Sequence, residues 1–290
     1  MAAVVDELPI VLLTRDEHAQ GKWLVDLTEA ITAAGPKVAI VRLSELDRLP
    51  ACRCLVNRVS DAAPPADVKI AFTALRTAEL RGVPVVNGTA SFALATSKLL
   101  HYELFAAAGL ATPPYCVVRR GADVGAAAAN AGLEFPLLLK PNSGGFGKGI
   151  VRLETSASIG ETAAADMDGA FGEDGVAVLQ EYAAPDAGKT YRVWFHSKGE
   201  VHCAVSVEPQ DDSYNACVCS VPNQPWDVPA DVAAATRNAA KIAGAECGSV
   251  ELLYHAGRPM YFDFNLLSTL PDNAAYEGLA EAIIDLAAAA

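Results

Sequence analysis

The sequence predicts two halves: an N-terminal α/β domain with a parallel sheet, then an α+β region with antiparallel sheets. Up to residue 88, short apolar runs alternate with helical segments, which is typical of βαβ units in a parallel sheet. From Thr112 on, strand-like runs follow one another through short links, which favours antiparallel pairing. The chain has 290 residues, 52% of them hydrophobic, so it is long enough for two or three packed units.

In the first half, helical spacing of apolar residues separates the helices from the strands. Trp23, Leu24, Leu27 and Ile31 recur at helical spacing, and the Gly-Pro pair at 35–36 ends that helix. Short runs rich in valine, isoleucine and leucine between the helices predict strands. We expect strands at residues 10–13, 38–43, 55–59 and 83–87, and helices at 23–33, 68–80 and 89–108.

In the second half, strands are more frequent and helices fit between them. Strands are expected at residues 115–118, 137–139, 150–153, 176–182, 191–195, 201–207, 248–254 and 259–266. Helices are expected at 123–131, 156–171, 228–243 and 272–289. We therefore divide the chain into an N-terminal βα domain (1–88), a subdomain with a central helix and a glycine-rich loop (89–172), and a C-terminal subdomain with a polar hairpin (173–290).

Charge and cysteine content narrow the class of protein. The net charge is −13, which argues against nucleic acid or an anionic membrane as a partner. No apolar run reaches the roughly 18 residues of a membrane span, and the acidic start lacks the basic region of a secretory signal. Seven scattered cysteines suit a reduced compartment, so we expect a cytoplasmic protein. Two pairs, Cys52/Cys54 and Cys217/Cys219, are interpreted as small buried strand residues rather than metal ligands.

Residues 135–154 contain the first candidate site. An apolar strand ends in Lys140, and a loop follows with Lys148 and four glycines at 144, 145, 147 and 149. Glycines let a backbone approach phosphate oxygens, and lysine supplies compensating charge. The loop leads into another strand rather than a helix, so it is neither a P-loop nor a dinucleotide fingerprint. It is either a lid over a polyphosphate or an ordinary flexible hairpin.

The second candidate site is a hairpin near the C-terminus. Asp263 and Asn265 are two residues apart on one strand and therefore face the same side. Glu251 lies on the partner strand. Two carboxylates and an amide oxygen are hard ligands that suit Mg²⁺. The alternative is a set of acidic residues facing solvent on an edge hairpin.

Taken in order, these segments resemble the ATP-grasp superfamily, and most closely its RimK-like carboxylate–amine ligases. The resemblance runs from about Val85 to Pro271. It implies that an ATP-grasp fold of two subdomains with antiparallel sheets follows the N-terminal domain. It also implies a ligase that uses ATP and Mg²⁺, with Mn²⁺ as an alternative metal. The substrates would be small-molecule or peptide carboxylates and amines; the sequence does not specify them or the oligomeric state.

The resemblance also implies roles for individual residues. Lys98 resembles the first nucleotide-binding lysine, and Lys140 resembles the lysine that reaches the ATP phosphates. Arg192 matches an arginine near the phosphates or acyl phosphate, so Lys140 and Arg192 are the expected catalytic residues. The lid would comprise Ser143, Gly144, Gly145, Phe146, Gly147, Lys148 and Gly149. Gln180, Glu181 and Tyr182 would form the hinge that reads adenine, and Lys189 would be a further nucleotide contact. The metal ligands would be Glu251, Asp263 and Asn265.

The sequence departs from the family pattern in four features. Thr190 replaces an acidic residue, and Ser213 stands where many relatives carry an arginine two residues before an asparagine, here Asn215. The metal hairpin has glutamate first and aspartate second, the reverse of the usual order. Ser-Thr-Leu-Pro at 268–271 replaces the usual Pro-Gly. These departures bear on the substrate and on ligase activity itself.

The favoured function is therefore an ATP-dependent ligase, and two alternatives remain open. Inositol-phosphate kinases share the fold and carry an Asp-x-Asn motif like Asp263-Phe264-Asn265, although the acidic composition leaves little room for a polyanion site. A non-catalytic nucleotide-binding protein is the other alternative, supported by the serine at 213. Arg58 follows a strand of the first domain, where α/β sheets bind ligands, and is either a substrate contact or a surface residue.

Overall fold

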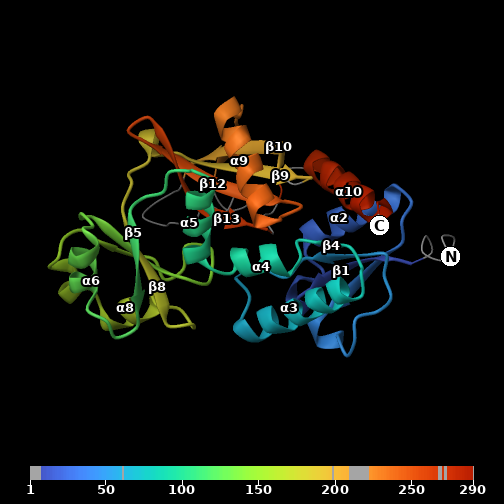
Figure 1. The fold of residues 1–290 in the computed structure, drawn as a ribbon, viewed down its shortest axis with the longest axis horizontal. Coiled ribbons are helices and arrows are strands. Elements are labelled where there is room, and N and C mark those ends of the chain that lie inside the picture. Colours follow the sequence, from blue (N-terminus) through green and yellow to red (C-terminus); the bar gives the residue numbers. More distant parts are fainter. Residues whose placement is uncertain are drawn as a thin grey trace.

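The computed structural model describes residues 8–60, 62–197, 199–208, 222–266, 270 and 273–289. These residues form three sheets in three lobes (Figure 1). The expected order is confirmed: a parallel sheet comes first and two antiparallel sheets follow. Among these residues, no helix is both long and apolar enough to cross a membrane.

The first sheet has the strand order β2-β1-β3-β4, and all its pairings are parallel. β1 is buried along its whole length, which explains its purely apolar sequence up to Thr14. Cys52 and Cys54 beside β3 are buried, as the sequence indicated. The elements are β1 (Ile10–Thr14), η1 (Asp16–His18), α2 (Lys22–Ala33), β2 (Val38–Arg42), η2 (Leu43–Glu45), β3 (Cys54–Asn57), α3 (Pro65–Leu80) and β4 (Val85–Val86).

The second sheet has the order β5-β8-β6-β7 and is antiparallel. It includes β8, so it runs across the subdomain boundary expected between residues 172 and 173. The glycine-rich loop connects β6 to its neighbour β7, which is an edge strand of this sheet. Its elements are β5 (Tyr115–Arg119), α6 (Val124–Ala131), β6 (Leu137–Pro141), β7 (Val151–Leu153), α7 (Ser158–Glu161), α8 (Ala164–Gly169) and β8 (Val176–Glu181).

The third sheet has the order β11-β10-β9-β12-β13 and contains the expected polar hairpin, β12–β13. The last helix, α10, packs back onto the first domain, where its buried side chains join those of α2 and β1 in one core (Figure 1). The elements are η3 (Asp186–Gly188), β9 (Thr190–His196), β10 (Glu200–Val207), β11 (Asn223–Pro225), α9 (Ala230–Ala243), β12 (Gly248–His255), β13 (Arg258–Asn265) and α10 (Asn273–Ala288).

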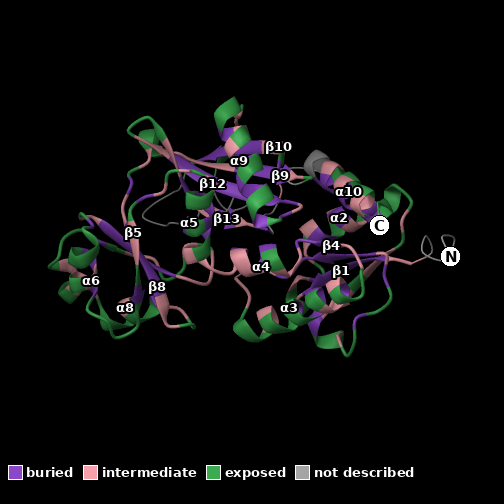
Figure 2. Ribbon diagram, in the orientation of Figure 1, coloured by how far each residue is buried: buried purple, intermediate pink, exposed green. Residues whose placement is uncertain are grey.

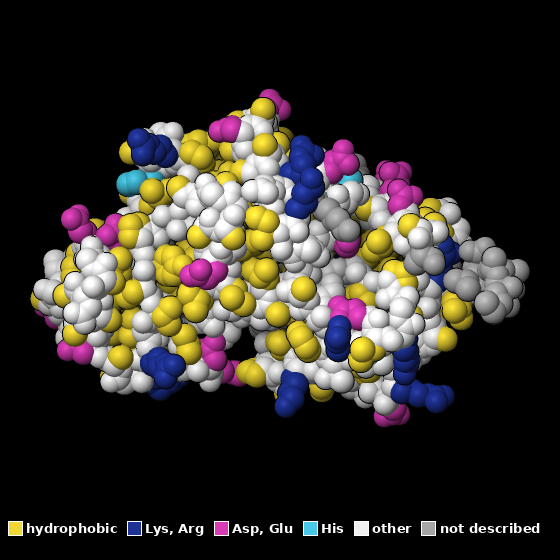
Figure 3. All heavy atoms as spheres, viewed as in Figure 1, with side chains coloured by type: hydrophobic (Ala, Val, Ile, Leu, Met, Phe, Trp, Pro, Cys, Tyr) yellow, Lys and Arg dark blue, Asp and Glu magenta, His cyan; other side chains and the backbone are white. Residues whose placement is uncertain are grey.

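Burial follows this layering. The strands are mostly buried, whereas α3, α6 and α9 expose their outer faces (Figure 2). A hollow opens between the lobe of β5–β8 and the first domain on the face drawn in Figure 3. The chain crosses this junction through α4 (Thr89–Ala95) and α5 (Lys98–Ala107).

Two segments that we expected to be single helices each form two helices, so these two predictions were wrong. Residues 89–108 form α4 and α5, because Ser97 is extended (φ −140°) and its hydroxyl caps α5 by accepting from the Leu100 N–H. Residues 156–171 form the short helices α7 and α8, because Thr162 is extended between them. Gly160 and Gly169 lower the helix propensity of this segment further. Apolar spacing alone detected neither break.

Asn87 connects the first sheet to the polar hairpin. It follows β4 with a left-handed backbone (φ +57°) and is buried. Its side-chain amide donates to the Leu266 carbonyl (3.2 Å) and accepts from the backbone N–H groups of Glu246 (3.2 Å) and Cys247 (3.3 Å). One side chain therefore satisfies three backbone groups at the ends of β12 and β13.

We predict that Asn87→Ala lowers the free energy of unfolding by about 2–3 kcal/mol, because buried groups lose their partner and alanine disfavours the left-handed backbone. Asn87→Gly also loses the hydrogen bonds but tolerates the backbone, so its loss is smaller. Urea denaturation of both variants measures the difference. A stability of Asn87→Ala equal to that of the wild type would contradict the role given to this side chain.

Candidate active site

The first turn of α5 presents three side chains to three parts of the molecule. Lys98, His101 and Tyr102 are three and four residues apart and therefore share one face of the helix. His101 and Tyr102 are buried, with exposed fractions of 1% and 0%. Each contacts a different group of the expected site.

Lys98 contacts the glycine-rich loop. Its ammonium donates to the Gly144 carbonyl at 2.8 Å, and its backbone N–H donates to the Asn142 carbonyl at 2.8 Å. The Asn142 side chain in turn accepts from the Ser97 hydroxyl (2.9 Å) and the Leu99 N–H (3.1 Å). The start of the loop is thus held against the N-terminus of α5.

The rest of the loop has a backbone that only special residues adopt easily. Phe146 has φ +59°, and Gly149 has φ +73° with no room for a side chain, since a Cβ there would lie 2.8 Å from the Gly169 carbonyl oxygen. Phe146 is 61% exposed and Lys148 is exposed. The loop therefore presents an aromatic ring and a lysine to solvent.

Tyr102 connects the buried Lys140 to Gln180. The Lys140 ammonium donates to the Tyr102 hydroxyl at 2.7 Å, and that hydroxyl donates to the Gln180 side chain. The Tyr102 ring stacks on Tyr115 at 4.4 Å. Burial, and then the charge of Lys98, lower the pKa of Lys140 to about 7. Protonation of Lys140 places a second positive charge near Lys98, which is unfavourable unless an anion compensates it.

The expected adenine hinge lies at the end of β8, and its polar groups already have partners. The Glu181 carboxylate accepts from the Glu134 backbone N–H at 2.9 Å. The Tyr182 N–H donates to the Pro136 carbonyl at 2.9 Å, and the guanidinium of Arg152 lies 4.1 Å over the Tyr182 ring. Gln180 is buried and accepts from the Tyr102 hydroxyl, so Tyr102 connects the expected hinge to Lys140.

The polar hairpin brings its three expected residues together. Asn265 donates from one amide nitrogen to Oε1 of Glu251 and to Oδ2 of Asp263, at 3.0 Å each. Arg192 on β9 forms an ion pair with Glu251. This follows from the sheet register, in which Glu251 lies opposite Arg192 on one side and Asp263 on the other.

His101 completes this cluster from α5. Its Nδ1 lies 3.0 Å from Oδ1 of Asp263, an ion pair when the ring is protonated. It also lies 3.3 Å from the backbone nitrogen of Phe264, and Nε2 lies 3.1 Å from the Ala95 carbonyl oxygen. The imidazole thus holds the Asp263 carboxylate against the helix.

The two carboxylates differ in their pKa. Burial raises the pKa of Glu251 to about 7, with a further rise from Asp263, while Arg192 opposes both. For Asp263, burial also raises the pKa, but Lys98 and His101 outweigh it and hold the pKa below its usual range. A proton or a cation between the two carboxylates reduces the repulsion between their negative charges.

The donor set fits Mg²⁺. Two carboxylates converge on one amide group, and oxygen ligands of this kind are those that Mg²⁺ prefers. The amide would present its oxygen to a metal; which of its two atoms is N or O is an assignment. Within the described residues, no three His, Cys, Asp or Glu side chains form a metal cluster.

The remaining expected residues have other surroundings. Lys189, the expected further nucleotide contact, forms an ion pair with Glu208 at 3.1 Å, and its expected role stays a prediction. Thr190 begins β9 with a buried hydroxyl that has no hydrogen-bond partner in the part of the chain that the structure describes. Ser213 and Asn215, Cys217 and Cys219, and residues 268, 269 and 271 of the Ser-Thr-Leu-Pro segment lie outside the described residues.

Comparison with solved structures identifies the fold. D-alanine–D-alanine ligase from Bacillus anthracis superposes with a TM-score of 0.72 over 97% of this chain and 98% of its own, at 17% identity. A RimK domain ATP-grasp protein from Sphaerobacter thermophilus gives 0.68 over 94% and 99%, at 16% identity. This chain has the ATP-grasp fold. The ATP-grasp ligase PsnB, solved with a minimal precursor, Mg and ADP, gives 0.68 over 96% and 97%, at 15% identity.

Sequence comparison adds less. No family model matches the chain. A curated D-alanine–D-alanine ligase from Geobacter sulfurreducens is 41% identical over 73 residues, which are 25% of this chain and 22% of that protein. The resemblance to the ATP-grasp proteins is thus confirmed as a fold, and the residue assignments within that ATP-grasp fold remain predictions.

Sequence reasoning missed His101 and Tyr102. Both follow Lys98 at helical spacing, and that spacing is the only signal that placed them near it. Their partners, Asp263 and Lys140, lie on other elements of the ATP-grasp fold, and no local pattern connects them.

Lys140 gives the site a measurable dependence on pH. Its pKa in the fold, about 7, lies below that of an unfolded lysine, so the unfolded chain binds an extra proton between about pH 7 and 10.5 and stability rises with pH in this window. From pH 7.5 to 9.0 we expect the wild type to gain about 1–2 kcal/mol relative to Lys140→Met. Urea denaturation at the two pH values measures this.

The matched control is Lys241→Met, which removes an exposed lysine on α9 and should follow the wild-type profile. Parallel profiles for the wild type and Lys140→Met would show that Lys140 keeps an ordinary pKa in the fold.

Proposed function

We propose that the protein is an ATP- and Mg²⁺-dependent ligase that joins a carboxylate to an amine and releases ADP and phosphate. One observation carries the proposal: the first turn of α5 brings Lys98, Lys140 and the Glu251–Asp263–Asn265 set around a single space in an ATP-grasp fold. Solved structures that share this fold over nearly the whole chain include ligases, one of them bound to Mg and ADP.

Three cations of the chain suit a polyphosphate. Lys98 and Lys140 interact with each other and with Asp263, and the buried Nε–H of Arg192 has no hydrogen-bond partner among the described residues. Phosphate oxygens would accept from these groups and from N–H groups of the glycine-rich loop. Because Lys140 has a pKa near 7, phosphate binding would draw it into its charged form.

Glu251, Asp263 and Asn265 would hold Mg²⁺. When bound, the metal would neutralise charge on phosphate oxygens. Arg192 and His101 orient the two carboxylates from opposite sides, Arg192 through Glu251 and His101 through Asp263. Neither carboxylate is then free to rotate out of the site.

The proposed reaction has two steps. An oxygen of the substrate carboxylate would attack the γ-phosphorus, a P–O bond would form, and the bond to ADP would break. The amine would then attack the acyl carbon, expel phosphate, and lose a proton, leaving an amide. The chain's residues bind and orient these groups, and the loop excludes water that would hydrolyse the acyl phosphate. No side chain acts as a nucleophile.

The test follows ADP and free phosphate during incubation with ATP, Mg²⁺ and pooled amino acids. We expect equal amounts of both, and a loss of about 100-fold or more in turnover for Asp263→Asn, which keeps the size but removes the charge. The matched control, Asp285→Asn, changes an exposed aspartate on α10 and should keep full turnover.

Other outcomes separate the alternatives. ADP released together with a phosphorylated product, without free phosphate, indicates a kinase. Nucleotide binding without turnover on any substrate indicates a non-catalytic protein. Full turnover by Asp263→Asn would refute the metal assignment.

A further inference from the structure

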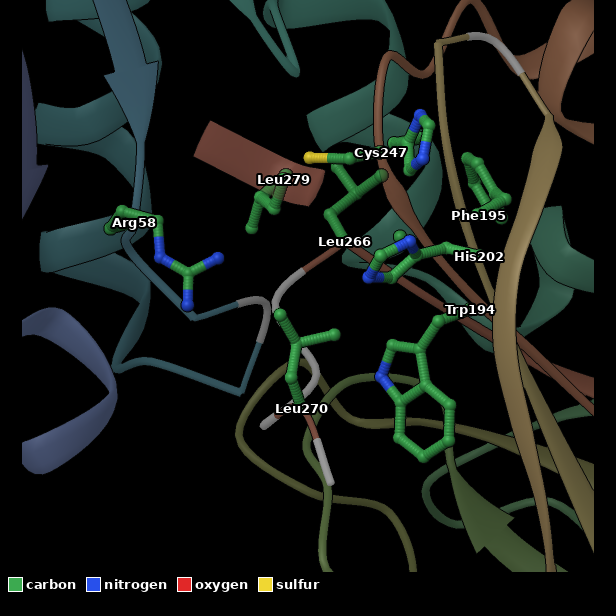
Figure 4. Close-up of a pocket in the computed structure, with 10 residues that line it drawn as sticks. Arg58, Trp194, Phe195, His202, Cys247, Leu266, Leu270 and Leu279 are labelled. Carbon is green, nitrogen blue, oxygen red and sulfur yellow. The ribbon is translucent and has the colours of Figure 1, made fainter. Parts of the chain in front are cut away.

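The junction between the first domain and the third sheet is closely packed (Figure 4). A cavity there, lined by Arg58 and Trp194 among others, has a volume of about 20 Å³, which is room for about one water molecule. Within the described residues it is too small for an organic substrate. Arg58 is 4% exposed and its guanidinium lies 4.4 Å over the Trp23 ring, so its interpretation as a surface residue was wrong. The buried polar network on α5 extends further and reaches the proposed nucleotide site.

Lys140 and Gln180 lie on the same face of the second sheet. In the pairing of β6 with β8, Gln180 lies opposite Leu138, and Lys140 is two residues from Leu138 along the strand. Tyr115 on β5 lies opposite Gln180 on the other side, so it shares this face. The opposite face of the sheet carries the core of this lobe. Lys140 and Gln180 therefore point away from that core and toward α5, which carries Tyr102.

Tyr102 covers this face of the sheet. Its side chain is fully buried and stacks on Tyr115, with the ring centroids 4.4 Å apart. Its hydroxyl accepts from the Lys140 ammonium at 2.7 Å and donates to the side-chain oxygen of Gln180. Stacking of the ring and two hydrogen bonds of the hydroxyl fix the position of the Tyr102 oxygen. The long, flexible side chain of Lys140 is therefore held at its charged end.

The Gln180 amide sets the direction of these hydrogen bonds. Its nitrogen donates to the Glu181 carbonyl at 3.3 Å, so its oxygen faces Tyr102 and accepts the hydroxyl proton. Because that proton is committed to Gln180, the hydroxyl presents its lone pairs to Lys140. Lone pairs bind an ammonium more strongly than a neutral amine. The Tyr102 hydroxyl therefore favours the charged form of Lys140.

Lys140 needs such a partner because its surroundings disfavour its charge. Burial, and then the charge of Lys98, lower the pKa of Lys140 to about 7, while Asp263 and Glu251 act in the opposite direction. Burial also raises the pKa of Tyr102 well above its ordinary value, so its hydroxyl stays neutral. The hydroxyl is thus a neutral acceptor that supports a charge at a buried position.

We propose that Tyr102 is a positioning residue of the nucleotide site, which holds the Lys140 ammonium ready for the terminal phosphates of ATP through the chain Lys140–Tyr102–Gln180. This inference rests on the proposed function and deepens it, since Tyr102 acts on the nucleotide through Lys140. Phosphate oxygens bind a charged lysine that is already in place more tightly than a neutral one that must first take up a proton.

The experiment measures ATP affinity and does not depend on turnover. Isothermal titration calorimetry gives the Kd of Mg-ATP for the full-length wild type and Tyr102→Phe at pH 6.0 and pH 8.5. At pH 6.0 Lys140 is largely charged before ATP binds, so we expect Tyr102→Phe to weaken binding about twofold or less. At pH 8.5 the amine is neutral and ATP must draw a proton onto it, so we expect a loss of about tenfold.

Tyr115→Phe is the matched control. It removes a hydroxyl from the ring stacked on Tyr102, and that hydroxyl donates to the exposed Glu103. We expect its ATP affinity relative to the wild type to be the same at both pH values. Lys140→Met, with and without Tyr102→Phe, shows whether Tyr102 acts through the lysine. These two proteins should bind ATP within about twofold of each other.

Gln180→Met keeps the inference testable if Tyr102→Phe fails to fold. It removes the acceptor of the hydroxyl proton, so Tyr102 can donate to a neutral Lys140 and favour the uncharged amine. The loss of ATP affinity should again be several-fold larger at pH 8.5 than at pH 6.0.

Three results would overturn the inference: a Tyr102→Phe effect that is the same at both pH values, an equal effect in the Lys140→Met background, or a Tyr115→Phe loss that grows with pH in the same way. The two proposals also fail separately. The expected dependence of ATP affinity on Tyr102 and pH, in a protein that turns over no carboxylate and amine, refutes the ligase alone. Ligase turnover with unchanged ATP affinity in Tyr102→Phe refutes the positioning role alone. A wild type that binds no ATP refutes both.

Discussion

The need to compensate buried charges governs this structure. Lys140, Glu251 and Arg192 are charged groups with little or no access to water, and a buried charge without partners costs several kcal/mol. The first turn of α5 supplies partners for two of the site's buried groups: His101 lies beside Asp263, and Tyr102 accepts from Lys140. The helix break at 96–97 is what turns these side chains toward two different sheets.

The same constraint links the domains. The Asn87 side chain hydrogen-bonds to backbone groups at the ends of β12 and β13, so the first domain holds the hairpin that carries the acidic residues. The cavity around Arg58 opens beside that connection, and Leu266 and Cys247 belong to both. The first domain and the third sheet therefore share one hydrogen-bonded junction at Asn87.

The strands were predictable because strand sequences are short, apolar and locally patterned. All the strands expected within the described residues are present, and Glu251 lies on the partner strand of the polar hairpin as expected, opposite Asp263. Helix continuity was harder. Residues 89–108 have helical spacing throughout, yet Ser97 turns its hydroxyl to cap a new helix and to bond Asn142, which is 45 residues away. A hydrogen-bond partner this far along the chain cannot be inferred from the residues next to Ser97.

The amino-acid sequence by itself determined the class of fold, the glycine-rich loop and the residue types of the candidate site, because these depend on local spacing and side-chain chemistry. The tertiary structure decided which of those residues meet. It paired Lys189 with Glu208, and it buried Arg58 over Trp23 beside a cavity. Both outcomes depend on sheet register and domain packing, which arise from contacts between residues far apart in the chain.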